Sequence, residues 1–271
     1  LDFSDAYFDE DSYLASVNVA HNLASLYFRA FDEPFVEEIK SYAVNYFRKI
    51  LSNLGWEPKK SDKHTDALLR TFAIAVLGKM NDDSVTDEAI RKYKKFLKSP
   101  RSLSPDLIET ICSIAAWNGN SKTFAELKKL YTNAKTMEEK LRFLGAMCGF
   151  QDKKLLIKTL DFSQTAAVRS QNMQLPIMKI AGNPYGDKVL WSWLKKNWKK
   201  INKKVGHGNP LFNRIVASIT GVADDSMEKE IKLFFKNNPT PGTERTQSQT
   251  LERIRINSKF LRTMRKEFKN G

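Results

Sequence analysis

The feature that most constrains this chain is a helical spacing of apolar residues that recurs between short capped turns. The stretch 183–220 shows it most clearly. Asn183 and Pro184 predict a helix start there, because asparagine caps helices and the first turn does not use the N–H that proline lacks. The apolar positions that follow share one helix face: Trp191, Leu194, Trp198, Ile201 and Val205. Gly206 and Gly208 then predict the end of the helix.

The same pattern extends over the whole chain. Ser104 with Pro105 predicts one helix start, and Thr136 with Glu139 fits a capping box at another. No strand-like alternation of useful length occurs, and 12 glycines and 9 prolines in 271 residues suit long helices. We therefore predict an all-α fold of a dozen or so helices, paired as antiparallel hairpins. Stacked hairpins would form a superhelical array over 1–271, a degenerate α-solenoid of the HEAT or armadillo kind, as a single domain.

The charge is high and uneven. Forty-five basic and 31 acidic side chains give a net charge of +14. The N-terminal stretch is acidic, whereas the segment from Lys179 onward is strongly basic. This balance is compatible with a polyanion, an acidic peptide or an acidic neighbouring domain as partner, and it does not choose among them.

Lysines cover the opposite side of the helix predicted after Asn183. Charged faces of this kind are usually only solvated. A second interpretation is nucleic-acid binding, because an aromatic residue among lysines could stack on bases while the lysines contact phosphates. Under that alternative the chain would be a basic HEAT-like nucleic-acid-binding or scaffold module. Its candidate residues are Trp193, Lys196, Lys199 and Lys203.

The two cysteines, Cys112 and Cys148, lie in apolar helical patterns and are expected to behave as small core residues. A disulfide framework is excluded at this count and length, which favours a reducing compartment. No apolar stretch is long enough to span a bilayer, and the acidic N-terminus is unlike a signal peptide. These observations predict a cytoplasmic protein with no membrane partner.

No catalytic motif is recognisable. Zinc peptidases of the HExxH type need two histidines one helical turn apart and a glutamate that activates water. None of His21, His64 and His207 is followed by that pattern, and the chain has no CxxC, P-loop or GxGxxG. We expect His21 to be a buried core histidine. The sequence thus predicts no catalytic residue, no metal ligand and no cofactor in this chain.

Several phrases together resemble one family. They are NPYG at 183–186 with the tryptophans and lysines after it, LGW at 54–56 with His64, Leu69 and Arg70 following, and LERIRIN at 251–257 before a terminal amphipathic helix. In combination they resemble the C-terminal helical domain of gluzincin zinc aminopeptidases, a family that includes puromycin-sensitive, endoplasmic-reticulum and archaeal tricorn-interacting enzymes. The resemblance extends from about Tyr13 to Phe268.

The resemblance implies a noncatalytic, bowl-shaped α-solenoid that faces a catalytic domain upstream of Leu1 and encloses the substrate chamber. Zinc would be bound in that upstream domain, whose HExxH and G-x-M-E-N motifs are absent here. The implied partners are the catalytic domain, short peptides trimmed from their N-termini, and an upstream protease complex such as tricorn or the proteasome. The archaeal tricorn-interacting type fits best. Nucleic acid is not an implied partner.

The resemblance also suggests substrate-facing residues. In antigen-trimming members, a tyrosine followed by a lysine, and an arginine just before NP, help to hold a peptide's C-terminus. The tyrosine corresponds to Tyr27, but Phe28 stands at the lysine position, beside Arg29, and Gly182 stands at the arginine position. With two of the three groups changed, we expect no length measurement through a terminal carboxylate. The candidates are Tyr27, Arg29 and Arg70.

Overall fold

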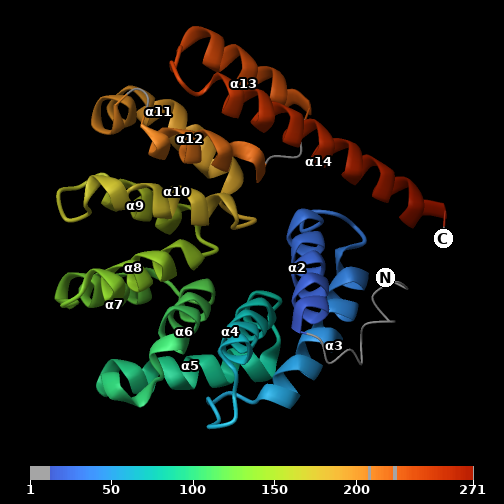
Figure 1. Cartoon of the computed structure of the whole chain (residues 1–271), viewed down its shortest axis with the longest axis vertical. Helices are drawn as coiled ribbons and strands as arrows, with labels where there is room; N and C mark the ends of the chain where they lie inside the picture. Colours follow the sequence, from blue (N-terminus) through green and yellow to red (C-terminus); the bar gives the residue numbers. More distant parts are fainter. Residues whose placement is uncertain (1–12, 207–208, 222–224, 271) are drawn as a thin grey trace. The chain divides into compact units, whose positions relative to one another are not determined.

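The computed structural model describes residues 13–206, 209–221 and 225–270. Over these ranges the chain forms thirteen α-helices and four short 3₁₀-helices, with no strand (Figure 1). The prediction of an all-α fold is confirmed. The acidic residues 1–12, His207 and Gly208 lie outside the described residues.

Contacts divide the chain into two compact units, residues 1–130 and 131–271. The prediction of one domain over 1–271 stays a prediction. The helices of the first unit are α2 (Tyr13–Arg29), α3 (Val36–Leu54), α4 (His64–Lys79), α5 (Asp83–Lys98) and α6 (Pro105–Trp117), with a 3₁₀ turn at Pro100–Ser102. Helix α7 (Ser121–Asn133) crosses the boundary between the units.

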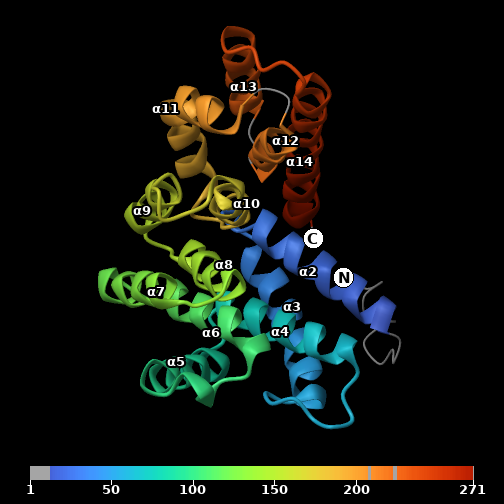
Figure 2. The same ribbon diagram turned by 60° about the vertical axis from the view of Figure 1, so that its left-hand side comes forward.

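Helix α4 is the centre of the first unit. It packs against α2, α3, α5 and α6, and Figure 2 shows α3 and α4 lying together. Its sequence suits this place, because apolar residues occur on several of its sides rather than in one stripe. The fully buried side chains Ala73, Ile74 and Leu77 lie on α4, and Ile39 and Ile111 lie on its neighbours α3 and α6.

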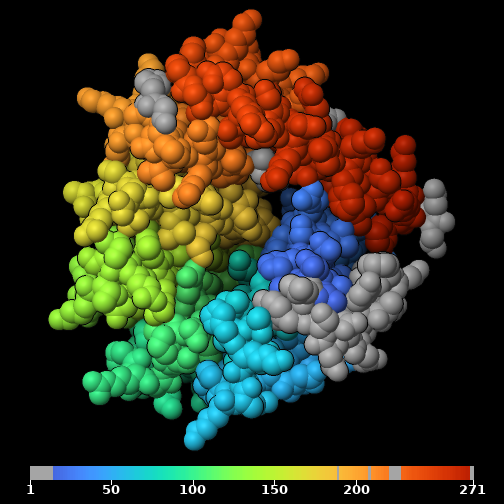
Figure 3. Space-filling view, viewed as in Figure 1, coloured from blue at the N-terminus to red at the C-terminus, as the bar shows by residue number. Residues whose placement is uncertain are grey.

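The second unit is built around α10 (Gln174–Ala181). The other helices are α8 (Met137–Ala146), α9 (Lys153–Ser163), α11 (Asp187–Val205), α12 (Pro210–Ala217), α13 (Asp225–Asn237) and α14 (Glu244–Asn270), with 3₁₀ turns at Met147–Gly149, Ser170–Asn172 and Ser218–Gly221. Helix α10 contacts α8, α9, α11 and α12, and α14 packs on α12 and α13. Side chains fill the spaces between these ribbons on the face that Figure 3 shows.

Aromatic rings join α11, α12 and α13. The Trp198 ring lies edge-on to Phe212, Phe234 and Phe235, with centroid distances of 5.0, 5.3 and 5.6 Å. Trp191 makes a similar contact with Phe234 at 5.1 Å. Edge-to-face pairs add about 0.5–1.5 kcal/mol each beyond the area that they bury. The apolar stripe of α11 predicted from sequence is thus part of the core of the second unit.

Most start signals act as predicted. The Thr136 hydroxyl accepts from the Glu139 N–H at 3.2 Å, while a Glu139 carboxylate oxygen accepts from the Thr136 N–H at 3.1 Å, which completes the capping box. Pro105 occupies the first turn of α6. The expectation for Asn183 was wrong, because α11 begins four residues later, at Asp187, and Gly186 is its N-cap residue.

His21 was also predicted wrongly. Its side chain is exposed on α2, and its ring stacks on Phe72 with a centroid distance of 4.3 Å. A helical wheel places His21 beside the apolar stripe, but the ring of Phe72 covers only one of its faces. The histidine therefore lies on the surface of the first unit.

Candidate functional site

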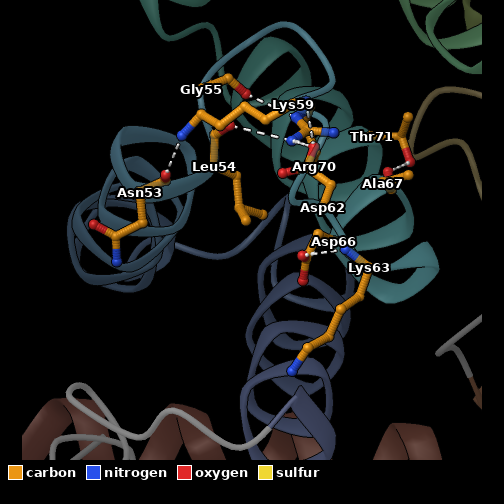
Figure 4. Close-up of polar contacts among 10 residues, drawn as sticks. All are labelled: Asn53, Leu54, Gly55, Lys59, Asp62, Lys63, Asp66, Ala67, Arg70 and Thr71. Carbon is orange, nitrogen blue, oxygen red and sulfur yellow. Dashed lines mark hydrogen bonds and ion pairs between the residues drawn. The ribbon is translucent and has the colours of Figure 1, made fainter.

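The sequence candidate that the structure places most definitely is Arg70. Its side chain is only 2% exposed, on α4. The guanidinium donates to the Gly55 carbonyl at 3.0 Å, to the Leu54 carbonyl at 3.1 Å and to the Asp62 carboxylate at 2.5 Å (Figure 4). Arg70 therefore fixes both ends of the loop between α3 and α4, and its donors point into the protein. This loop anchor differs from the substrate-facing role for which Arg70 was a candidate.

The conformation of the loop places its acceptors around Arg70. Helix α3 ends at Gly55, whose φ of 69° is a left-handed conformation that glycine adopts without strain. The Asp62 carboxylate also accepts from the Lys59 N–H at 2.8 Å. That backbone bond and the bond from Arg70 hold the pKa of Asp62 below its usual value. The LGW phrase and Arg70 thus form a hydrogen-bonded network that holds the loop between α3 and α4.

The aromatic side of the same loop is held by Lys92 on α5. Its ammonium lies 5.7 Å from the centroid of the Trp56 ring, and it also pairs with Glu57. Trp56 is half-buried between the loop and α5.

Tyr27 and Arg29 lie at the end of α2 with different exposure. The Tyr27 side chain is 4% exposed, and its ring makes edge contacts with Phe28 and Phe31. Arg29 is exposed in the last turn of α2. Phe28, at the position of the family lysine, faces the ammonium of Lys79 at 5.6 Å from its ring centroid. Arg29 is therefore the accessible member of this group. Gly182, at the position of the family arginine, ends α10 in the second unit.

The basic face of α11 differs from its prediction at one residue. Lys196, Lys199 and Lys203 are exposed, as expected. Trp193 is buried, at 5% exposure, and its indole N–H donates to the Asp161 carboxylate of α9 at 2.8 Å. Trp193 packs between two helices and is not available to stack on a base. A helix with neighbours on two sides hides more than one apolar stripe, which the sequence alone does not reveal.

Asn183 has a role that differs from the helix cap predicted from the sequence. This residue is 3% exposed, and its amide nitrogen donates to the carbonyls of Cys148 and Phe150 at 3.0 and 2.9 Å. Its amide oxygen accepts from the Tyr185 N–H at 3.0 Å. Asn183 thus ties the turn before α11 to the segment after α8. The NPYG phrase is the only sequence signal of this buried amide, and the same phrase is equally typical of an ordinary helix cap.

Gly186 completes that turn. A Cβ atom at this position would lie 2.2 Å from the Ile180 carbonyl oxygen, closer than real contacts allow. The obstacle is backbone, which cannot rotate away as a side chain can. The NPxG spacing therefore pairs a buried amide with a position that has no room for a side chain.

The described ranges contain no group of three or more His, Cys, Asp or Glu residues that could hold a metal ion. Cys112 and Cys148 are buried, as predicted, and burial raises the pKa of the Cys112 thiol well above its usual range. A small pocket of about 10 Å³ next to Trp191 and Leu194 has room for roughly one water molecule. None of the helices that the structure describes has a stretch long and apolar enough to traverse a bilayer.

Comparison with known proteins identifies the family. Residues 1–256 match the sequence profile of the ERAP1-like C-terminal domain. The chain belongs to this family. This ERAP1-like domain is similar to aminopeptidase M1-D of Oryza sativa subsp. japonica, with 29% identity over 264 residues that are 96% of the chain and 30% of the relative.

Two further relatives give the same picture. Aminopeptidase M1 of Arabidopsis thaliana is 27% identical over 241 residues, 87% of the chain and 27% of the relative. The mitochondrial aminopeptidase 2 of Saccharomyces cerevisiae is 25% identical over 260 residues, 93% of the chain and 27% of the relative. The chain spans less than a third of the length of these curated relatives. It corresponds to the C-terminal domain of an aminopeptidase of the M1 type.

Proposed function

We propose that this chain is the noncatalytic C-terminal domain of a zinc-dependent aminopeptidase that trims N-terminal residues from short peptides. The observation that carries the proposal is the family match, which covers residues 1–256 of 271. The relatives are named aminopeptidases, and they are more than three times as long as the region they share with this chain. In this proposal the catalytic domain precedes Leu1 and supplies the zinc and the glutamate that activates water.

The role of the domain would be to enclose the substrate chamber and to open and close against the catalytic part. A curved α-solenoid is the architecture we propose for that task. Contacts within the second unit support it. Helix α11 bonds to α9 through Trp193 and Asp161, and to α13 through Trp191 and Glu230 at 3.1 Å, so these three helices form a row. Helix α10 contacts both α9 and α11.

The finer assignments remain proposals. They are the archaeal tricorn-interacting type, an upstream protease such as tricorn or the proteasome as partner, and a cytoplasmic location. Trp193 does not stack on nucleic-acid bases, because its indole is buried and donates to Asp161.

The direct test is to express the 271-residue chain and, separately, the protein encoded by its reading frame extended upstream. Both are assayed with aminoacyl-7-amino-4-methylcoumarin substrates, with and without a zinc chelator. The extended protein should release coumarin in a chelator-sensitive manner, and the chain should release none. Hydrolysis by a metal-free preparation of the chain, or an upstream frame with no HExxH, would refute the proposal.

Arg29 provides a test of substrate contact in the extended enzyme. Arg29→Ala should raise KM for peptides with a free terminal carboxylate and leave KM unchanged for the corresponding C-terminal amides, because an exposed guanidinium favours a carboxylate. Arg91→Ala is the matched control, since Arg91 is 66% exposed and pairs only locally with Glu88. Equal effects on the acid and the amide would remove Arg29 as a carboxylate contact.

A further inference from the structure

The positive charge of this chain belongs to one of its units. Residues 131–271 carry 27 Lys and Arg against 12 Asp and Glu, a net charge of +15. Residues 1–130 carry 18 against 19, a net charge of −1. Within the second unit, α11 has seven lysines and one acidic residue, Asp187 in its first turn. The net positive charge therefore belongs to residues 131–271 and is not spread evenly over the chain.

Five lysines of α11 are exposed: Lys195, Lys196, Lys199, Lys200 and Lys203. Three of them, Lys196, Lys199 and Lys203, follow the spacing i, i+3, i+7. In a helix with 3.6 residues per turn these three lie within roughly 60° of arc and about 10 Å along the axis. They form a narrow ridge, which we call the lysine ridge.

The lysine ridge stands on a fixed support. Trp191, Leu194 and Ile201 on the other side of the helix are buried. The indole nitrogens of Trp191 and Trp193 bond to Glu230 of α13 and Asp161 of α9. Because the helix is held on two sides, docking on the ridge would order only lysine side chains and no backbone.

The charge of the ridge is not neutralised within the described part of the chain. Lys195 pairs with Glu230, at the edge of the exposed face. For Lys196, Lys199 and Lys203, no described carboxylate lies within ion-pair distance. On the same helix, burial first and the charge of Lys200 second lower the pKa of Lys204. A ridge of uncompensated ammonium groups is complementary to an anionic partner.

We propose that the lysine ridge docks an acidic polypeptide segment whose carboxylates recur at one-turn spacing. A helix with Glu or Asp at i, i+3 or i+4, and i+7 would bring one carboxylate to each of Lys196, Lys199 and Lys203. Nucleic acid fits less well, because all three tryptophans of α11 are buried and the helix carries no arginine. This interaction is separate from the peptidase role proposed above.

The test uses the 271-residue chain and a fluorescein-labelled 16-residue helical peptide with Glu at i, i+3 and i+7. The same peptide with Gln at those positions and a 16-nucleotide single-stranded DNA are the comparison probes. Binding is followed by fluorescence anisotropy at 50 and 150 mM salt. The variant is Lys196→Gln, Lys199→Gln and Lys203→Gln combined. These side chains are exposed, so the fold should persist, and a circular-dichroism melt verifies it.

A matched control is available on α13. Lys229, Lys232 and Lys236 are exposed and have the same i, i+3, i+7 spacing, so their triple Gln variant removes the same charge from the same unit. We expect the ridge variant to bind the Glu peptide about tenfold more weakly, as three exposed ion pairs of ordinary strength would give. The α13 variant should stay within about twofold of the unmodified chain.

Four results would overturn the proposal. Equal losses in the two triple variants would mean that bulk charge drives binding. Equal binding of the Gln peptide, or no binding of the Glu peptide at 50 mM salt, would remove the carboxylate contact. DNA binding that is tighter than peptide binding and is lost in the ridge variant would assign the ridge to nucleic acid.

Discussion

The two units of this chain stabilise their turns with different chemistry. In residues 1–130 two of the anchors are charged, the buried guanidinium of Arg70 and the Asp82 carboxylate, which is 1% exposed and 2.6 Å from Arg48, and the Trp117 indole adds a neutral bond to Asn81 at 3.0 Å. In residues 131–271 the buried anchors are neutral donors, the amide of Asn183 and the indoles of Trp191 and Trp193. The balanced unit thus uses charge inside, and the strongly basic unit leaves its lysines outside.

The difference matters because removing a buried charge and removing a buried amide should lower the free energy of unfolding by different amounts. Removing one member of a buried ion pair leaves the other member desolvated and unpaired, whereas removing the neutral amide of Asn183 leaves only the unpaired carbonyls of Cys148 and Phe150. We therefore expect mutation of an anchor in the first unit to cost more than mutation of one in the second. The predictions that follow test this order.

The largest effect is expected for Arg70→Ala. The change leaves the carbonyls of Leu54 and Gly55 and the Asp62 carboxylate without their donor, and it should lower the free energy of unfolding by about 3 kcal/mol. Urea denaturation measures the loss, and hydrogen exchange should place it in residues 1–130. Arg91→Ala is the control, because this arginine is 66% exposed, and it should leave the free energy of unfolding nearly unchanged. Equal losses in the two variants would contradict the role of Arg70.

Asn183→Ala should have the second largest effect. It should lower the free energy of unfolding by about 2 kcal/mol, because the carbonyls of Cys148 and Phe150 lose a buried donor. Increased hydrogen exchange should appear in residues 131–271. Asn197→Ala is the matched control, since its amide donates only to the Trp193 carbonyl of its own helix, and about 0.5 kcal/mol or less is expected. A loss larger than that of Arg70→Ala would reverse the proposed order.

A smaller effect is expected for Trp193→Phe. Phenylalanine keeps most of the apolar contact but cannot donate to Asp161, so the expected loss is about 1 kcal/mol. Asp161→Asn should weaken the same contact, and a double-mutant cycle should show coupling between the two residues. Additive losses would mean that the indole and the carboxylate do not interact in solution.

The smallest expected effect is the loss of the Asp62 contribution to stability at acid pH. The folded-state pKa of Asp62 is lowered, first by the Lys59 N–H and then by Arg70, so its contribution to stability is complete above the unfolded-state value near 4. This contribution should be lost as the pH falls through the lowered folded-state pKa. Urea denaturation of the unmodified chain and of Asp62→Asn, from about two pH units below to about two pH units above the unfolded-state value near 4, measures it. The two stabilities should converge at the acid end, and a constant difference would exclude the Asp62 contribution.

The sequence was sufficient for the fold class and for many local features. Helical periodicity and capping residues are local signals, so the all-α fold, the Thr136–Glu139 capping box and the buried cysteines could be predicted. The family resemblance was carried by phrases such as NPYG and LGW, and the family match confirmed its coarse form.

The sites were harder to predict because they depend on contacts between distant residues. Asn183 donates to carbonyls more than 30 residues away, and the Trp193 indole donates to the carboxylate of an aspartate 32 residues earlier. Helical position alone places Trp193 among lysines and His21 among apolar residues. The neighbouring helices decide their actual exposure, and the spacing of residues within one helix does not specify those neighbours.

The central claim is that the chain is the metal-free part of a zinc aminopeptidase, and zinc stoichiometry tests it most directly. Elemental analysis should be run on the 271-residue chain and on the protein from the upstream-extended reading frame, both purified without chelator. The account predicts about one zinc per molecule in the extended protein, from an HExxH site, and none in the chain. Stoichiometric zinc in the chain alone, or none in an extended protein that is folded and active, would contradict it.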